Sequence, residues 1–279
     1  MTAVSVAVLC LLTLAVIIVP AVARDDPLAI RDVLRLRLLP PGASDAEGTF
    51  HLLGTDSFGR DLFVRIMLGG RVSLAVGVVG SLLAGAIGTL LGAVGAWRGG
   101  LVDRTLMSVA DALLAIPRLV LLLVCAALWQ PGLATVLVVL IATGWMGVAR
   151  MVRAEVLGVR ALPYVDAAVA LGAAPWRVLW RHALPNALGP AIVATTLGVG
   201  NAILLESGLS FLGLGIQPPR ASWGNMIAGG RELIVNAPWV AITPGIALVI
   251  TVLACTLLGD ALRDRLAGEA GAATLRDRT

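Results

Sequence analysis

Apolar residues in this chain gather in six long runs that shorter polar segments separate. A helix needs about 20 apolar residues to cross the hydrocarbon core of a bilayer, and each run comes close to that length or exceeds it. The runs lie at about 3–22, 72–97, 106–129, 132–151, 189–213 and 239–260. This pattern predicts an all-α membrane protein with six transmembrane helices.

The runs also divide the chain into parts. We expect an N-terminal anchor helix, an extracytoplasmic loop, a five-helix transmembrane domain and a cytoplasmic tail, at 1–22, 23–71, 72–260 and 261–279. The first run has an alternative interpretation, because Ala21-Val22-Ala23 resembles a signal-peptidase site. Its length and the lack of a basic segment before it favour an uncleaved anchor.

Arginines set the predicted orientation. Cytoplasmic segments of membrane proteins carry an excess of basic residues, and acidic residues count little. With both termini inside the cell, eleven arginines lie in cytoplasmic segments and nine in external ones. The asymmetry is small, and it favours cytoplasmic termini.

Composition excludes several classes of function. The chain is 58% hydrophobic with a mean hydropathy of +0.94, which is more apolar than a soluble domain. Lysine is absent, so neither a Walker A phosphate loop nor a Schiff-base nucleophile can form. No Cys-x-x-Cys or His-Glu-x-x-His spacing occurs, and we predict no metal site. No arginine cluster with interleaved aromatic residues indicates nucleic-acid binding.

Small residues recur on the second run. Ala84, Gly88, Gly92 and Ala96 are spaced four residues apart, and such a ridge lets two membrane helices approach closely. In a chain this rich in Gly and Ala, chance is an equally good explanation.

The longest polar interval in the second half of the chain, about 152–188, is the predicted main cytoplasmic loop. Tyr164 to Leu171 contains good helix formers, Gly172 can end or turn that helix, and Pro175 suits the first turn of a second helix running to Pro185. Two short helices around a glycine would make a compact protrusion. The alternative is an amphipathic helix lying flat on the lipid, with its two tryptophans at the headgroups.

Three groups of residues follow one another along the chain. The first is Gly54-Thr-Asp-Ser-Phe-Gly-Arg-Asp61, with Arg65, Gly69, Arg71, Ser73 and Leu74 behind it. The second is Asp166-Ala-Ala-x-x-x-Gly172, followed by Arg181-His182-x-Leu184-Pro185-Asn186. The third is Leu209-Ser-Phe-Leu-Gly-Leu-Gly-Ile-Gln-Pro-Pro219, followed by Trp223-Gly-Asn-Met226, Ala237-Pro238-Trp239, Pro244-Gly245 and Leu258-Gly259-Asp260-Ala-Leu-Arg263-Asp264. In order and spacing these groups resemble the C-type permeases of the dipeptide/oligopeptide/nickel branch of ABC importers, over about residues 50–265.

The resemblance implies the type I importer fold and a set of partners. A second, B-type permease would complete the translocation path, and an extracytoplasmic substrate-binding protein would deliver the cargo. Two cytoplasmic ATPase subunits, or two domains of one, would bind ATP and Mg²⁺, so this chain needs no cofactor of its own. The second group of residues resembles the EAA loop on which those ATPases dock, with Asp166 where the loop's name has Glu. The implied coupling residues are Asp166, Ala167, Ala168, Gly172, Ala173, Arg177, Leu184 and Pro185.

Charged residues also occur inside the apolar runs. Glu206 lies in the fifth run with Ser207 and Ser210 beside it, and an intramembrane carboxylate is costly enough to expect a function. We expect these three residues to line the path or the interface between permeases; the alternative is a solvated carboxylate at a helix end. Asp111 and Arg118, seven residues apart on the third run, are expected to share a face as a structural pair.

Di- or oligopeptides are the expected cargo, with nickel or another small solute as the alternative. An intramembrane enzyme is the rival from another class, and it would use Ser207 or Ser210 with His182. That pairing is implausible, because the histidine lies before the span that carries both serines toward its far end. A receptor or structural membrane protein is a third possibility, but neither would need the EAA spacing.

Overall fold

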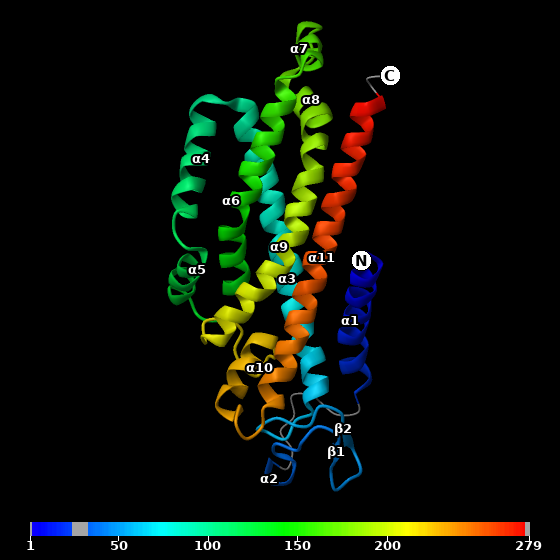
Figure 1. The fold of residues 1–279 in the computed structure, drawn as a ribbon. Helices are drawn as coiled ribbons and strands as arrows, with labels where there is room; N and C mark the ends of the chain where they lie inside the picture. Colours follow the sequence, from blue (N-terminus) through cyan, green and yellow to red (C-terminus); the bar gives the residue numbers. More distant parts are fainter. Residues whose placement is uncertain (1, 24–32, 277–279) are drawn as a thin grey trace.

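The computed structural model describes residues 2–23 and 33–276, with the side chains of 3–23 and 33–266. It is an elongated helical bundle with a small irregular cap at one end (Figure 1). The elements in chain order are α1 (Thr2–Val22), α2 (Val33–Leu36), β1 (Ala43–Ser44), β2 (Phe50–His51), α3 (Leu62–Arg98), α4 (Gly100–Leu114), α5 (Arg118–Ala127), α6 (Leu133–Arg160), α7 (Pro163–Ala170), α8 (Pro175–Val178), the π-helical turn η1 (Leu179–Ala183), α9 (Leu184–Phe211), α10 (Trp223–Gly230), the 3₁₀ turn η2 (Arg231–Leu233) and α11 (Trp239–Arg276).

Four long helices, α3, α6, α9 and α11, form the body of the bundle, and α1 runs beside α3 and α11 (Figure 1). The start of α1 and the end of α11 both point toward the end of the molecule that carries α7. The opposite end holds α2, α10 and the antiparallel pair β1–β2, in which Ala43 is opposite His51. Termini that point toward the same end are consistent with an even number of membrane crossings.

The prediction that the third span is one continuous helix is wrong. Within the described residues, five helices are long and apolar enough to cross a membrane, and α4 with α5 forms a sixth span only as a pair bent by 90°. Pro117 explains the break, because a proline disfavours helical backbone in the residue before it. The expected helix at 106–129 is therefore two shorter helices joined at mid-bundle.

Several helices are longer than the apolar runs that predicted them. The helix α3 begins at Leu62, ten residues before the predicted span, because the carboxylate of Asp61 caps it by accepting a hydrogen bond from the Val64 amide at 2.9 Å. Likewise α6 continues to Arg160, and α11 continues to Arg276 through the segment predicted as a tail. Hydropathy marks the apolar part of a helix, whereas caps and packing decide where the helix ends.

The small-residue ridge of α3 is confirmed as a packing surface. A Cβ added to Gly88 would press on the side chain of Val148, and one added to Gly92 would strike the backbone of Ala149. Ala84 and Ala96 on the same ridge are buried. The helices α3 and α6 therefore approach closely along this ridge, as small residues permit.

The cap at the lower end is held by polar contacts of Asp56. Its carboxylate accepts hydrogen bonds from the amides of Phe58 and Arg60 and from Arg60 Nε, at 2.8, 3.0 and 2.8 Å. The amide of Gly59 donates to the Asp56 carbonyl at 3.1 Å, which is the hydrogen bond that closes a four-residue β-turn. Asp45, also in the cap, has a lowered pKa, chiefly because the Thr49 amide donates to its carboxylate.

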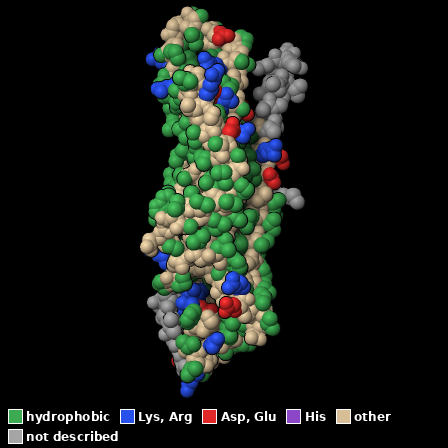
Figure 2. Space-filling model, turned by 90° about the vertical axis from the view of Figure 1, so that its left-hand side faces the viewer, with side chains coloured by type: hydrophobic (Ala, Val, Ile, Leu, Met, Phe, Trp, Pro, Cys, Tyr) green, Lys and Arg blue, Asp and Glu red, His purple; other side chains and the backbone are tan. Residues whose placement is uncertain are grey.

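The surface has the pattern of a membrane protein. Apolar and small side chains cover the middle of the face in Figure 2, and charged side chains gather toward its two ends. Leu82, Ile192 and Leu253 are examples of large apolar side chains that point outward from the long helices. Such a surface fits the hydrocarbon of a bilayer and not water.

Candidate functional site

The α7–α8 hairpin, residues 163–178, lies at the upper end of the bundle, with α7 at the tip (Figure 1). Its turn is closed by two backbone hydrogen bonds: the Ala173 amide donates to the Ala168 carbonyl at 3.0 Å, and the Gly172 amide donates to the Val169 carbonyl at 2.9 Å. These are the two bonds of a Schellman motif, which ends a helix at a residue in left-handed conformation. The predicted helix–glycine–helix protrusion is present.

Gly172 is the residue in that conformation, with φ of +89°. L-residues that carry a Cβ rarely adopt this backbone conformation. A Cβ added at Gly172 would have no atom within 4 Å, so glycine is required there by the backbone conformation and not by lack of space.

Two buried valines fix the hairpin to the bundle. Val165 of α7 and Val178 of α8 belong to one apolar cluster with residues of α3, α6 and α9, among them Ala96, Val152 and Ala187. The exposed fractions of Val165 and Val178 are 3% and 1%. The hairpin is therefore packed directly on the ends of three long helices.

The outer face of the hairpin is uncovered in this chain. Leu171 at the turn is 89% exposed, and Val169 and Trp176 are each nearly half exposed. The carboxylate of Asp166 is exposed in the first turn of α7. Apolar side chains around a free carboxylate make this face suited to contact another protein.

The structure brings the predicted coupling residues together on this hairpin and the helix that follows it. The exposed members are Asp166, Ala167, Gly172, Arg177 and Pro185. The half-buried members, which pack against the apolar cluster, are Ala168, Ala173 and Leu184.

The second short helix does not end at Pro185 as predicted. Pro175 to Phe211 is one continuous helix of 37 residues, and η1 is a π-helical turn in it, in which the Leu184 amide donates to the Leu179 carbonyl. A proline lacks an amide hydrogen and clashes with the carbonyl four residues before it. The wider π turn just before Pro185 accommodates both effects, so α8 is continuous with α9.

Two aromatic contacts, which were not predicted from the sequence, join the hairpin to η1. The rings of Tyr164 on α7 and His182 on η1 meet edge to face, with centroids 6.2 Å apart. Trp176 and Trp180 meet in the same way at 5.7 Å. The spacing of four residues between the tryptophans places them on one helix face and could have indicated their contact.

Glu206 lies near the other end of α9 and is fully enclosed. Its exposed fraction is 0%. One carboxylate oxygen accepts a hydrogen bond from Ser210 Oγ at 2.7 Å, and the other accepts one from Ser73 Oγ of α3 at 3.0 Å. The hydroxyl of Ser73 in turn accepts from the Trp223 amide at 3.3 Å, which links α10 to the same group.

The burial of Glu206 corrects the alternative interpretation of its position. A solvated carboxylate at a helix end does not fit a fully buried side chain. Ser207 and Ser210 are also buried within the chain, with exposed fractions of 5% and 3%, and the expectation that the three residues line a path or an interface between permeases stays a prediction. The cluster instead ties α3, α9 and α10 together, because a buried carboxylate must be satisfied by hydrogen bonds.

The enzyme hypothesis also fails on geometry. His182 lies in η1, and Ser207 lies 25 residues farther along the same continuous helix. At about 1.5 Å per residue the two are roughly 35 Å apart. They cannot form a nucleophile–base pair.

The predicted pair of Asp111 and Arg118 is wrong, because the break at Pro117 separates them. Asp111 instead pairs with Arg150 of α6 at 3.2 Å. A second link between the same helices joins Asp103 to Arg153 through two hydrogen bonds of 2.5 and 2.7 Å. The helix α4 is thus fixed to α6 by two ion pairs, while Arg118 points elsewhere.

The chain matches the family model described as "Binding-protein-dependent transport system inner membrane component" over residues 85–269. The matched segment contains the α7–α8 hairpin and the Glu206 cluster on α9. It leaves α1 and the cap outside.

Relatives and solved structures agree with this match. The chain is 41% identical over 258 residues to a putative peptide transport system permease protein of Brucella suis, which covers 92% of this chain and 84% of that protein. It is 39% identical over 271 residues to the probable D,D-dipeptide transport system permease protein DdpC of Escherichia coli, covering 97% of this chain and 88% of DdpC. With the dipeptide transport system permease protein DppC of Bacillus subtilis it shares 40% over 238 residues, 85% of this chain and 72% of DppC.

A chain of the MetNI methionine ABC transporter, solved in inward-facing conformations, superposes with a TM-score of 0.59 at 22% identity. The superposition covers 73% of this chain and 95% of the MetNI chain, so the two share a fold. With the family model and these relatives, the fold shows that the chain belongs to the binding-protein-dependent transport system inner membrane components and has the type I ABC importer permease fold.

Proposed function

We propose that this chain forms half of the translocation path of a peptide importer and that its α7–α8 hairpin receives the motion of a partner ATPase. The observation that supports this coupling is that one side of the hairpin is buried and the other is exposed. Val165 and Val178 are buried against three long helices, while Leu171 on the outer face is 89% exposed.

The hairpin can transmit motion because both of its helices connect to α9 or to the turn that begins it. The helix α8 is continuous with α9, and Tyr164 of α7 contacts His182 of η1. A displacement of the outer face therefore moves α9 as a unit. The short arm of Asp166 adds a carboxylate with which a basic residue of the ATPase can pair.

The hairpin end is cytoplasmic in this proposal. Both termini point toward it (Figure 1), and arginines such as Arg98, Arg160 and Arg177 gather there as they do at cytoplasmic edges. The cap and α10 at the opposite end then face the extracytoplasmic binding protein. A second permease completes the path beside this chain.

Energy enters through the partners, which bind ATP and Mg²⁺ in two subunits or in two domains of one chain. Support comes from the sequence, since a chain without lysine has no Walker A loop. The chain itself contributes no catalytic residue and requires no cofactor.

Di- or oligopeptides are the cargo that we propose. The support is that relatives from three bacteria, each about 40% identical to this chain, are named as peptide or dipeptide permeases. Uptake of a labelled dipeptide into proteoliposomes that contain the whole complex, compared with uptake of Ni²⁺, tests the cargo directly.

A pair of valine variants tests the coupling. Val165→Ala removes buried contacts of α7, at a cost of about 2 kcal/mol, and should lower uptake per ATP hydrolysed. Val169→Ala changes the same residue type on the exposed face. It should leave the stability of the chain within about 0.5 kcal/mol and weaken binding of the ATPase. If Val169→Ala binds the ATPase as tightly as the wild type, the outer face of α7 is not the docking surface.

A further inference from the structure

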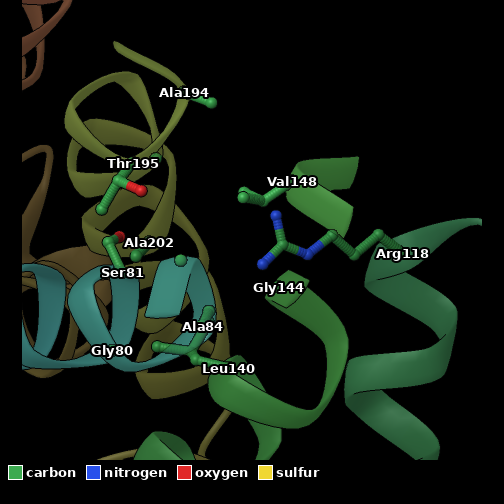
Figure 3. A pocket seen from close by; sticks show the side chains of 12 residues that line it. Gly80, Ser81, Ala84, Arg118, Leu140, Gly144, Val148, Ala194, Thr195 and Ala202 are labelled. Carbon is green, nitrogen blue, oxygen red and sulfur yellow. The ribbon is translucent and has the colours of Figure 1, made fainter. Parts of the chain in front are cut away.

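Arg118 is a cation in the middle of the bundle. It is the first residue of α5, directly after the break at Pro117. Its guanidinium group reaches from α5 toward α6 and the facing helices α3 and α9 (Figure 3). There it lines a cavity of about 50 Å³ together with Ser81 of α3, Gly144 of α6 and Thr195 of α9.

Arg118 has no anionic partner within the part of the chain that the structure describes. Among the described residues, no ion pair includes Arg118, and its Nε atom is buried without a hydrogen-bond partner. The carboxylate expected to pair with it, Asp111, binds Arg150, and the buried carboxylate of Glu206 accepts from serines. Arginine stays charged in proteins, and an unpaired charge within a membrane span is costly.

Small residues around the cavity leave room for the guanidinium group of Arg118. A Cβ added to Gly144 would lie 2.8 Å from Ala84 Cβ and 3.4 Å from a terminal nitrogen of Arg118. Glycine at 144 therefore lets the guanidinium group pass over α6 into the cavity. Ser81 and Thr195 bring two hydroxyl groups to its α3 and α9 walls.

We propose that Arg118 binds the carboxylate of the cargo as the cargo passes the middle of the bundle. This inference rests on the proposed peptide cargo, since a peptide ends in a carboxylate. A guanidinium group presents paired N–H donors that match the two oxygens of a carboxylate, and a cavity of about 50 Å³ has room for one such group.

A carboxylate side chain of the second permease is the competing occupant. The cavity is lined by α3, α5, α6 and α9 of this chain. A side chain of the second permease could enter it only if the backbone of its own helix came against the mouth of the cavity. The end of a peptide carries no such bulk. The position of Arg118 at a broken helix near mid-bundle also resembles the place where secondary transporters bind their cargo.

The test compares two cargos and three variants in proteoliposomes that contain the complete importer. The cargos are a labelled dipeptide with a free carboxylate and its C-terminal amide, both first shown to bind the binding protein. The variants are Arg118→Gln, Arg118→Lys and, as a matched control, Arg150→Gln, in which an arginine of α6 with a 57% exposed side chain loses the same charge.

Arg118→Gln should lower kcat/KM for the free dipeptide about tenfold or more, as expected for loss of a hydrogen-bonded charge. The same variant should change kcat/KM for the amide less than twofold. Arg118→Lys should keep more activity on the free dipeptide than Arg118→Gln, and Arg150→Gln should stay within twofold of wild type for both cargos.

Three results would overturn the proposal. Equal losses of kcat/KM for both cargos would show that Arg118 does not bind the carboxylate of the cargo. Loss of the second permease on purification of Arg118→Gln would assign the cation to that partner. Equal activity of Arg118→Lys and Arg118→Gln on the free dipeptide would overturn it without use of the amide. Failure of the wild type to import either peptide would instead refute the proposed cargo.

Discussion

Gly172 offers the sharpest test of how the α7–α8 hairpin is built. Its φ is +89°, and a Cβ added there would have no atom within 4 Å. Replacing it should therefore cost about 1–2 kcal/mol for the left-handed backbone and little for crowding. Because the cost lies in the backbone, Gly172→Ala and Gly172→Leu should be destabilised by nearly the same amount.

A cost of about 1–2 kcal/mol lowers the ratio of the native turn to alternative turns by a factor of about 5–30. The Ala173 amide, which donates to the Ala168 carbonyl, should then exchange its hydrogen faster by a similar factor. Transport by the complete importer should fall while membrane insertion is unchanged, because the turn lies outside the apolar spans.

Gly158→Ala is the matched control. Gly158 lies in α6 near the hairpin, and a Cβ added there also has no atom within 4 Å, but its backbone is helical. The added methyl group should stabilise the helix by about 0.5–1 kcal/mol and leave transport intact. Amide exchange at the turn and uptake per ATP hydrolysed are the assays. A harmless Gly172→Ala with a disabling Gly172→Leu would refute the backbone argument, because only crowding separates the two.

Three further predictions follow from other parts of the molecule. Glu206→Ala should lower the thermal stability of the chain, since Ser73 and Ser210 lose their buried acceptor at about 1–3 kcal/mol each, and Glu206→Gln should be milder; unchanged melting of both variants would contradict the enclosed cluster. Arg153→Ala should destabilise the chain more than Arg150→Ala, because the Asp103 and Arg153 side chains are 14% and 34% exposed, whereas Arg150 and Asp111 are 57% and 60% exposed; thermal unfolding of the two variants should show that order. The purified chain alone should neither bind nor hydrolyse ATP, as equilibrium binding of a labelled nucleotide can show, and micromolar affinity would contradict it.

The sequence predicted the membrane helices and the hairpin because both leave local signals. Apolar runs of about 20 residues mark spans, and a glycine followed three residues later by Pro175 marks a helix end and a helix start. The ridge from Ala84 to Ala96 was predicted from its spacing alone, and its partner helix became known only from the structure.

Other features depend on which distant residues meet. Glu206 was expected on a surface, because nothing local shows that Ser73 of α3 would enclose it with Ser210. The pairing of Asp111 with Arg150 and the isolation of Arg118 both follow from the 90° bend between α4 and α5. Pro117 was a visible signal for that bend, and Pro185 was one for the π turn.

Photo-crosslinking from two exposed apolar positions tests the central claim, that the α7–α8 hairpin is where the ATPase docks. Leu171 in the hairpin and Val235 between η2 and α11 are 89% and 86% exposed, and they lie at opposite ends of the bundle. A benzophenone amino acid at each position, in membranes that contain the active importer, should give an ATPase adduct from position 171 and none from position 235. An ATPase adduct from position 235, or none from position 171 in an importer that still transports, would contradict the account.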